Sequence, residues 1–338
     1  MAQITIIGMG LIGTSIGLAV KNAKLSNIKI VGYDVEHGNA RLAYKKLAID
    51  SVEGNLRNAV KGADLIVIAT PVSAIHDVLA EIGRDMPAQC AVTDTGSTKQ
   101  QVLKWAEELL PKGASFIGGH PMAGKETSGP EAGEANLFRE KVWCLFPSRH
   151  AEDWAVEAVV SMVESIGGKP YFLDPQEHDS FVAAASHMPI ALSAALVSAT
   201  SKSPSWHEIA RLASSGYRDV SRLASGDPTM NRDIYLTNAE EIGGWIDRAI
   251  TELLEIRKAL KDKDEKALAG YFASVYEERA KWVAGAVHGP SIGADIKVPS
   301  MGQQMTTIFL GNLLADKSKK LMDSYEARAE GKGKKDGR

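Results

Sequence analysis

Cysteine is scarce in this 338-residue chain, which contains only Cys90 and Cys144. Two isolated cysteines exclude a disulfide framework and a thiolate metal site, and they suit a reducing compartment. An excess of charge of one sign is lacking as well, because 39 basic and 42 acidic residues leave a formal net charge of -3. Without a basic excess, we expect neither nucleic acid nor an anionic membrane as a partner.

Long apolar runs are also lacking. The N-terminal residues do not have the charged start and apolar centre of a signal peptide, and no later run approaches about 18 apolar residues without polar interruption. We therefore expect a cytoplasmic protein that is neither secreted nor membrane-spanning. The composition, with 44% hydrophobic and 24% charged residues, is that of a soluble globular protein, and the length allows two domains.

A glycine motif near the N-terminus lies between a predicted strand and a predicted helix. The β-branched run over residues 3–7 leads into Gly8-Met9-Gly10-Leu11-Ile12-Gly13 and then into a helical pattern. A second predicted strand ends at Asp34, about 20 residues later, as in dinucleotide-binding βαβ units. Gly8 would permit the tight turn, Gly10 the close approach of a pyrophosphate, and Gly13 close helix packing. The alternative is a βαβ unit with a structural role only.

Asp34 favours NAD over NADP, because a carboxylate accepts hydrogen bonds from ribose hydroxyls and repels a 2′-phosphate. Apolar runs over residues 63–70 and 91–94 predict further strands, buried on both faces of a parallel sheet. Thr70-Pro71-Val72 and Asp94-Thr95-Gly96-Ser97-Thr98-Lys99 follow these strands at the carboxyl edge, where ligands of such sheets bind. Both are candidate cofactor or substrate loops, although Ser97 could instead be a helix N-cap.

The stretch Gly118-Gly119-His120-Pro121-Met122-Ala123-Gly124 has a single histidine between glycines and a proline. These neighbours disfavour a regular helix or strand, so we expect an active-site loop that presents the imidazole of His120 to a ligand. Imidazole is the side chain whose ordinary pKa suits proton transfer near neutral pH. A turn that happens to expose its histidine is the alternative.

The pattern becomes helical from Pro175 onward. The Ala-rich residues 175–200 are apolar on most sides and predict a buried central helix. Pro189 should bend this helix beside His187, which is either a satisfied core histidine or a ligand contact. Residues 216–228 carry the mixed charges of a compact loop and turn, where Arg222 is either a solvated charge or a fork for a carboxylate. Further helices are expected over residues 231 onward, 240–260 and 265–287.

The predicted fold class is an α/β Rossmann dinucleotide-binding domain, followed by an all-α helical domain. We place the first domain at residues 1–174 and the second at residues 175–290. Residues 291–338 form a C-terminal extension without a clear pattern. Its polar, charged last residues should be disordered.

Taken together, the motifs resemble the prephenate dehydrogenase family, which includes arogenate and cyclohexadienyl dehydrogenases. The resemblance extends to about residue 287 and implies a Rossmann domain followed by a helical domain through which two subunits dimerise. It rests on five segments: Gly8-Met9-Gly10-Leu11-Ile12-Gly13; Asp94-Thr95-Gly96-Ser97-Thr98-Lys99; Gly118-Gly119-His120-Pro121-Met122-Ala123-Gly124 with Glu126 and Ser128-Gly129; Ser186-His187-Met188-Pro189; and Asp219-Val220-Ser221-Arg222 with Asp227-Pro228.

The resemblance implies NAD-dependent oxidative decarboxylation of prephenate to 4-hydroxyphenylpyruvate in tyrosine biosynthesis. Hydride passes from C4 to the nicotinamide, a base removes the hydroxyl proton, and aromatisation drives the loss of CO₂ without a metal. His120 would be the base and Ser97 the hydroxyl that orients it. Arg222 would hold a substrate carboxylate, His187 would contact the substrate, and Glu126 and Asp219 would pair with Arg222. The cofactor would be held by Gly8, Gly10, Leu11, Ile12, Gly13, Asp34, Thr70 and Pro71.

Lys125 departs from the family pattern, because several members carry a small hydroxyl residue there. An arogenate dehydrogenase is the nearest alternative function. A β-hydroxyacid dehydrogenase is a second, but the lysine that such enzymes place in a glycine-rich helical motif is not found after Pro175. A non-catalytic NAD-binding protein would not require His120, Ser97, His187 and Arg222 together.

Overall fold

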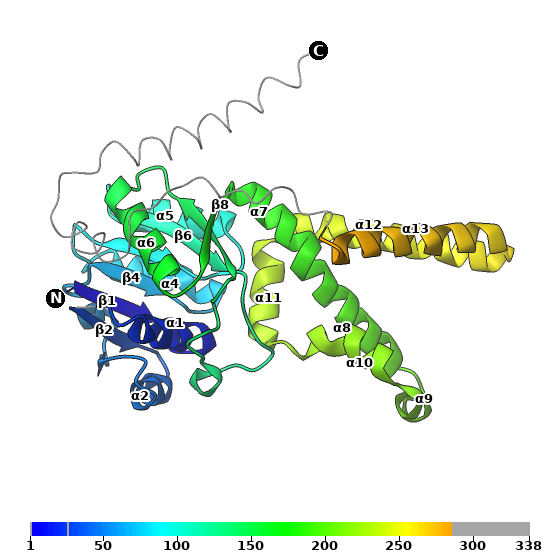
Figure 1. Ribbon diagram of the computed structural model, residues 1–338, viewed down its shortest axis with the longest axis horizontal. Helices are drawn as coiled ribbons and strands as arrows, with labels where there is room; N and C mark the ends of the chain where they lie inside the picture. The colour runs from blue at the N-terminus through cyan, green and yellow to red at the C-terminus, as the bar shows by residue number, and fades with distance from the viewer. Residues whose placement is uncertain (1, 26, 286–338) are drawn as a thin grey trace, which may run out of the picture.

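The computed structural model describes residues 2–25 and 27–285. An α/β part lies at one end, and a helical part extends away from it (Figure 1). The expected end of the last helix at residue 287, the extension over residues 291–338 and its disordered end lie outside the described residues.

In the described part of the chain, eight strands form one sheet in the order β3-β2-β1-β4-β5-β6-β7-β8. Neighbouring strands pair in parallel, except β6 and β7, which are antiparallel. This order, with helical crossovers, is that of a doubly wound dinucleotide-binding sheet and confirms the predicted Rossmann fold. The strands are β1 (Ala2–Ile7), β2 (Ile28–Tyr33), β3 (Ser51–Val52), β4 (Leu65–Ile68), β5 (Ala91–Asp94), β6 (Ser115–Pro121), β7 (Val142–Pro147) and β8 (Lys169–Phe172).

Helices cover both faces of the sheet, and each face has its own core. On β4, Leu65 and Val67 belong to one core, whereas Ile66 and Ile68 belong to the other. Successive strand residues point to opposite faces, so a strand covered on both sides must be apolar throughout. Helices α1 (Leu11–Asn22), α2 (His37–Lys45) and α6 (Asp153–Ser165) contribute to the first core, and α3 (Leu56–Val60), α4 (Val72–Ile82) and α5 (Gln100–Leu109) to the second.

The helical part begins with one long, continuous helix. It consists of α7 (Pro175–Val182), a π-helical turn at Ala183–His187, and α8 (Met188–Ser201). The irregularity expected beside His187 is therefore this π turn. Pro189 has no N–H to donate to the preceding turn, which removes one hydrogen bond of the α-helical pattern.

The mixed-charge segment over residues 216–228 is helical rather than the expected loop and turn. It contains α10 (Ser215–Ser221) and a 3₁₀ turn at Arg222–Ser225, after α9 (Trp206–Leu212). Its charges mark an exposed helix surface, because no residue of α10 is buried. Asp227 then accepts a hydrogen bond from Met230 N and so caps α11 (Pro228–Thr237).

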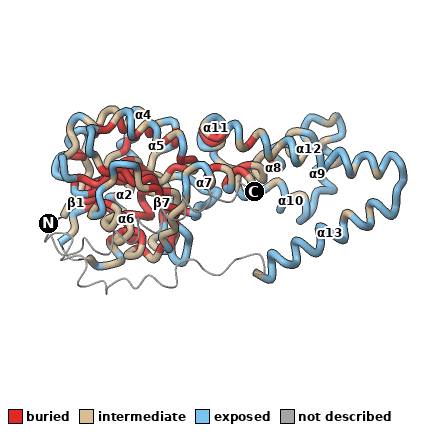
Figure 2. Tube along the Cα trace, turned by 90° about the horizontal axis from the view of Figure 1, so that it is seen from above, coloured by how far each residue is buried: buried red, intermediate tan, exposed pale blue. Residues whose placement is uncertain are grey.

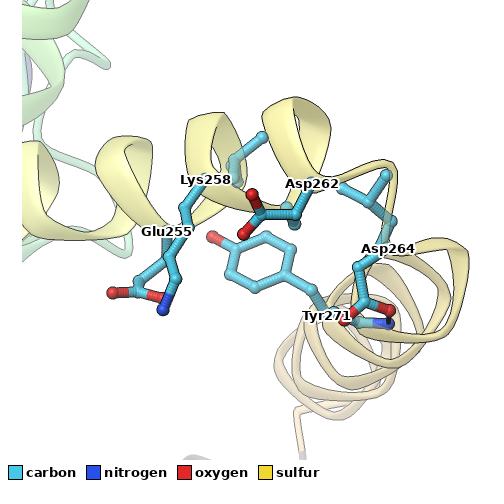
Figure 3. A pocket seen from close by; sticks show the side chains of 9 residues that line it. Glu255, Lys258, Asp262, Asp264 and Tyr271 are labelled. Carbon is cyan, nitrogen blue, oxygen red and sulfur yellow. Dashed lines mark hydrogen bonds between the residues drawn. The ribbon is translucent and has the colours of Figure 1, made fainter.

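Two long helices complete the described chain and project as an arm (Figures 1 and 2). They are α12 (Ala239–Asp262) and α13 (Glu265–Val283), which are joined at Lys263 in a left-handed conformation. A hollow of about 210 Å³ lies between them, where Tyr271 of α13 approaches Glu255 and Lys258 of α12 (Figure 3). Because it lies on the arm, away from the sheet, we do not place the active site there.

The helix over Pro175–Ser201 is not the buried core helix that the sequence predicts. Only 22% of its most apolar window is buried, and by length and composition alone it could cross a membrane. However, His178, Asp179 and His187 on this helix are buried against other parts of the protein. Because its own chain leaves this apolar helix largely uncovered, another surface should cover it. The buried polar residues on the helix favour a protein surface over lipid.

Side-chain contacts join the helical part to the α/β part. Asp233 of α11 accepts a hydrogen bond from Ser73 N at the start of α4, with a distance of 3.0 Å. The hydroxyls of Thr98 and Thr237 are 2.8 Å apart. The carboxylate of Asp179 on α7 accepts from the backbone at the start of α5. The helical part therefore packs against the carboxyl edge of the sheet.

Candidate active site

The carboxyl ends of β1, β4, β5 and β6 meet along one edge, because these strands are neighbours and parallel. Four candidate segments of the sequence therefore gather there: the glycine motif, the Thr70-Pro71 pair, the segment from Asp94 to Lys99, and His120. In doubly wound sheets, this edge is where ligands bind.

The glycine turn is built for close approach. Gly8 has φ 93°, and a Cβ on it would lie 2.6 Å from Ala69 O. A Cβ on Gly13 would lie 1.9 Å from Gly8 O, so α1 packs against the turn only with glycine there. Gly10, by contrast, has nothing within 4 Å of its Cβ position. Open space before the N–H groups at the start of a helix fits a phosphate group.

Asp34 supports the same turn. It is 7% exposed, and its carboxylate accepts from Met9 N at 2.7 Å and from Glu36 N at 2.8 Å. A carboxylate has about four lone-pair sites, so acceptors remain for ribose hydroxyls. The Thr70 hydroxyl oxygen is buried and has no hydrogen-bond partner among the described residues. Such an orphan polar atom beside Gly8 is also consistent with a bound group.

His120 lies at the end of strand β6, not in a loop as predicted. It is opposite Cys144 in the antiparallel pairing with β7. Gly119 makes this possible, because a Cβ there would lie 2.4 Å from Asp94 O, and glycine lets β6 approach the end of β5. Pro121 is tolerated because it ends the strand. The antiparallel partner strand is remote in sequence, so residue propensities did not reveal it.

The imidazole of His120 is half-buried, and its Nδ1 lies 2.9 Å from Nε2 of His178. The two rings meet edge to face, with 5.0 Å between centroids. Burial lowers the pKa of His120 well below 6.5, and the nearby His178, Lys99 and His187 lower it further. His120 is therefore neutral near neutral pH and able to accept a proton.

His178 and Asp179 were not singled out by the sequence analysis. Nδ1 of His178 lies 2.8 Å from Oδ1 of Asp179. The same carboxylate accepts from Lys99 N at 2.8 Å and from Gln100 N at 2.9 Å, so it caps α5, which has no cap from its own N-cap side chain. An adjacent His-Asp pair at the start of the long helix that runs into an Ala-rich apolar stretch was the available signal, because buried polar groups need partners.

Lys99 and Asp94 form a fully buried ion pair next to His120. The ammonium of Lys99 also donates to Gly119 O at 2.7 Å, while Asp94 accepts from Gly119 N at 3.0 Å and from Gly96 N at 2.7 Å. Burial lowers the pKa of Lys99, and the charge of Asp94 opposes this shift. The pair holds both polar backbone groups of Gly119 and thereby fixes the strand end that carries His120.

His187 is buried in the π turn and contacts α11 and the start of α12. Its Nδ1 lies 3.3 Å from Nδ2 of Asn238, and its backbone carbonyl accepts from the Tyr235 hydroxyl at 2.8 Å. Burial lowers the pKa of His187 to about 4, so the ring is neutral near neutral pH. The Nδ1 atom of His187 therefore has a hydrogen-bond partner within the protein, as expected for a core histidine.

Ser97 is half-buried, and within the described ranges its hydroxyl forms no hydrogen bond. The N-cap of α5 is Lys99, so the alternative of Ser97 as N-cap is wrong. His178, rather than Ser97, is the hydrogen-bond partner of His120 in this structure.

At the exposed rim, Arg222 of the helical part pairs with Glu126 of the α/β part, as expected. Glu126 has a lowered pKa because Arg222 donates to it. Asp219 is exposed and forms no ion pair with any described residue, which differs from the expected pairing with Arg222. Lys125 pairs with Glu134 in the segment that follows β6.

Open space at a glycine turn and a neutral imidazole at the same sheet edge are features that a nucleotide-dependent dehydrogenase requires. Comparison with known families identifies which one. Residues 16–172 match "Prephenate dehydrogenase, nucleotide-binding domain", and residues 174–274 match "Prephenate dehydrogenase, dimerization domain". The chain belongs to the prephenate dehydrogenase family and is an oxidoreductase.

Individual relatives agree with this assignment. The prephenate dehydrogenase of Bacillus subtilis (strain 168) is 34% identical over 278 residues, which cover 82% of this chain and 75% of the relative. A structure of prephenate dehydrogenase from A. aeolicus, in complex with hydroxyphenyl propionate and NAD+, has a TM-score of 0.77 at 27% identity, covering 83% of this chain and 98% of that one. For Synechocystis arogenate dehydrogenase the TM-score is 0.69 at 26% identity, with 83% and 99% covered.

The buried pair predicts a large stability difference between two lysine variants. Lys99→Met leaves Asp94 buried without its counter-charge and should lower the free energy of unfolding by about 3–5 kcal/mol. Lys21→Met breaks the partly exposed pair with Asp50 and should cost only about 0.2–1 kcal/mol. Urea denaturation of both variants measures the difference. Equal losses would show that the Lys99–Asp94 pair does not hold this edge of the sheet.

Proposed function

We propose that this protein catalyses the NAD-dependent oxidative decarboxylation of prephenate to 4-hydroxyphenylpyruvate, a step of tyrosine biosynthesis. One observation carries the proposal: the neutral, half-buried imidazole of His120 lies at the same sheet edge as the glycine turn. The names of the relatives in Bacillus subtilis and A. aeolicus support the substrate and the cofactor. As a soluble biosynthetic enzyme, the protein would act in the cytoplasm.

NAD, when bound, supplies the hydride acceptor. Gly10 leaves room for its pyrophosphate, Gly8 and Gly13 allow the tight turn and the close packing of α1, and the N–H groups of Leu11 and Ile12 at the start of α1 would bind the pyrophosphate. The remaining acceptors of Asp34 would bind the adenosine ribose. Thr70 and Pro71 follow β4 and would line the space next to the turn. The Thr70 hydroxyl, which has no hydrogen-bond partner among the described residues, would bind the cofactor there.

The chemical work assigned to this chain's residues is removal of one proton. His120 would accept the proton of the substrate 4-hydroxyl as C4 gives up its hydride, and the resulting C4 carbonyl would withdraw electrons as CO₂ leaves the ring. Aromatisation drives this loss, so positioning and one base are sufficient. The Lys99–Asp94 pair keeps the base in place, and Ser97 remains free to bind cofactor or substrate.

Recognition of a substrate carboxylate is assigned to Arg222, and a further substrate contact to His187; both residues belong to the helical part. The Arg222 side chain is 58% exposed, and Glu126 is its ion-pair partner among the described residues, so an incoming carboxylate would replace one acidic partner with another. Glu126 would thereby hold Arg222 at the mouth of the site. For Asp219, only its position on α10, near Arg222, supports a role at this rim.

Two copies would assemble through their helical parts. Residues 174–274 match the dimerization domain of the family, and this part exposes an unusual number of large apolar side chains. A second copy would cover the apolar helix that its own chain leaves open. Over residues 175–283 the exposed large apolar residues are Phe181, Leu192, Leu212, Val220, Met230, Leu236, Ile250, Leu253, Leu254, Leu260, Phe272, Val275, Tyr276, Trp282 and Val283.

Arogenate, which differs from prephenate in carrying an amino in place of the keto group on its side chain, is the alternative substrate. The similarity to Synechocystis arogenate dehydrogenase supports arogenate as the alternative substrate. Measuring NADH formation with each substrate distinguishes a prephenate dehydrogenase from an arogenate dehydrogenase. NADH formation with either substrate also excludes a non-catalytic NAD-binding protein. If the protein turned over neither prephenate nor arogenate, the proposal would be refuted.

Replacing His120 tests the proposed base. His120→Asn keeps the approximate size but removes the proton acceptor, so kcat should fall by roughly 10²–10⁴ with little change in KM. In the unaltered enzyme, kcat/KM should decline only as the pH drops well below 6.5, because protonation removes the base and the pKa of His120 is lowered. This acidic limb should be absent in the variant. Near-normal kcat would assign the base elsewhere.

Replacing Arg222 tests carboxylate binding. Arg222→Gln removes a charge-assisted hydrogen bond, so KM for prephenate should rise by about one to two orders of magnitude, with a smaller effect on kcat. Arg218→Gln, on the preceding helix α10, is the matched control for loss of an exposed positive charge and should leave KM unchanged. Equal KM values for both variants would contradict the role of Arg222.

Replacing Asp34 tests cofactor choice. Asp34→Ser removes the repulsion of a 2′-phosphate and the ribose acceptors, so the ratio of kcat/KM for NADP over NAD should rise. Because Asp34 also holds Met9 N, binding of both cofactors should weaken. Steady-state kinetics with each cofactor measure the ratio. An unchanged ratio would mean that another residue sets the preference.

A further inference from the structure

We propose that His178 and Asp179 are positioning residues that hold the proton of His120 on Nδ1 and leave Nε2 as the basic atom. This inference rests on the proposed function insofar as His120 is the base. The three side chains form a continuous chain of hydrogen bonds from the junction of the two parts of the protein to the sheet edge.

The direction of this chain is fixed at the Asp179 end. An ionised carboxylate can only accept hydrogen bonds, so the 2.8 Å contact with His178 requires a proton on Nδ1 of His178. The same carboxylate also accepts from two backbone N–H groups at the positive end of helix α5, so donors surround it. Both His178 and Asp179 are buried, at 1% and 0% exposure, so water does not compete for these bonds.

The proton on Nδ1 of His178 determines the state of its other nitrogen. In neutral imidazole one nitrogen donates and the other accepts, so Nε2 of His178 is an acceptor. The 2.9 Å contact between the rings then requires that Nδ1 of His120 donates. The lone pair of His120 is therefore on Nε2, the ring nitrogen not used by His178.

His187 provides a contrast within the same network. The amide nitrogen of Asn238 donates to Asp179 O at 2.8 Å and also contacts Nδ1 of His187 at 3.3 Å. Both amide protons are directed at acceptors, so Nδ1 of His187 is unprotonated and its proton lies on Nε2. The two histidines are thus expected in opposite tautomers, with His120 an acceptor at Nε2 and His187 a donor there.

The arrangement also supports the charge that forms during proton transfer. When the O–H bond of the substrate breaks and an N–H bond forms at Nε2, His120 becomes a cation that still donates from Nδ1 to His178. The negative charge of Asp179, acting through His178, stabilises that cation. The cationic Lys99 and the His187 ring also face His120, but Asp94 balances the charge of Lys99.

The tautomers can be measured directly on the full-length enzyme without substrate. The protein is labelled with ¹⁵N-histidine, and two-bond nitrogen–proton correlation spectra are recorded at about pH 7, where both rings are neutral. His120→Asn and His187→Asn assign the signals by their disappearance. We expect the Nδ1–H form for His120 and the Nε2–H form for His187. An Nε2–H form of His120 in the unaltered enzyme would overturn the proposal.

Variants test the link to Asp179. In Asp179→Asn the amide can donate to His178 and reverse the chain, so His120 should lose its Nδ1–H form and kcat should fall by roughly 10²–10⁴ with little change in KM. Asp233→Asn is the matched control, because Asp233 likewise accepts from the start of a helix in the α/β part, but the partners of its carboxylate among the described residues are Ser73 and Arg232 rather than a histidine. It should leave the His120 tautomer unchanged. The same tautomer in both variants would contradict the proposal.

A second pair of variants avoids reliance on Asp179, which also joins the two parts of the protein. His178→Gln retains an oxygen that can accept from Nδ1 of His120, whereas His178→Leu retains none. The Gln variant should preserve the Nδ1–H form and more of kcat than the Leu variant. Equal tautomer populations in both would refute the positioning role. Because the spectra need no turnover, a failure of this proposal is distinguishable from loss of the proposed activity.

Discussion

The buried carboxylate of Asp179 is the interaction on which the rest of the site depends. A desolvated negative charge is costly unless every acceptor site is used, and here the donors come from helix α5 and from His178. Satisfying this one charge therefore docks the helical part on the sheet edge, caps α5 and orients the ring that contacts His120. Domain packing, the capping of α5 and the orientation of the His178 ring are consequences of the same contact.

A second buried charge pair fixes the other side of the base. Lys99 and Asp94 bind both polar backbone groups of Gly119, and the glycine lets β6 approach β5 closely enough for these bonds. His120 is thus held by its strand from one side and by His178 from the other. Such double support is the physical requirement for a proton acceptor that must keep its orientation while substrates exchange.

Much of the fold was predictable because local patterns encode it. The glycine turn, Asp34 at the end of β2, the continuously apolar strands and the change to helices at Pro175 all follow from periodicity and backbone constraints. The three errors have different origins. The strand that carries His120 depends on pairing with β7, the helical state of residues 216–228 on exposed charges that resemble a loop, and the open face of α8 on a surface outside the single chain.

The sequence by itself determined the Rossmann architecture, the nucleotide site and the identity of His120 and Arg222 as candidates, because each lies within a short motif whose chemistry is local. Only the tertiary structure decided which residues hold His120. His178 and Asp179 are 58 and 59 positions from His120, and Lys99 is 21 positions away. Their roles arise from burial, which removes water and forces each charge and each ring nitrogen to find a protein partner. No pattern along the chain specifies those partners, since they are chosen by proximity in three dimensions.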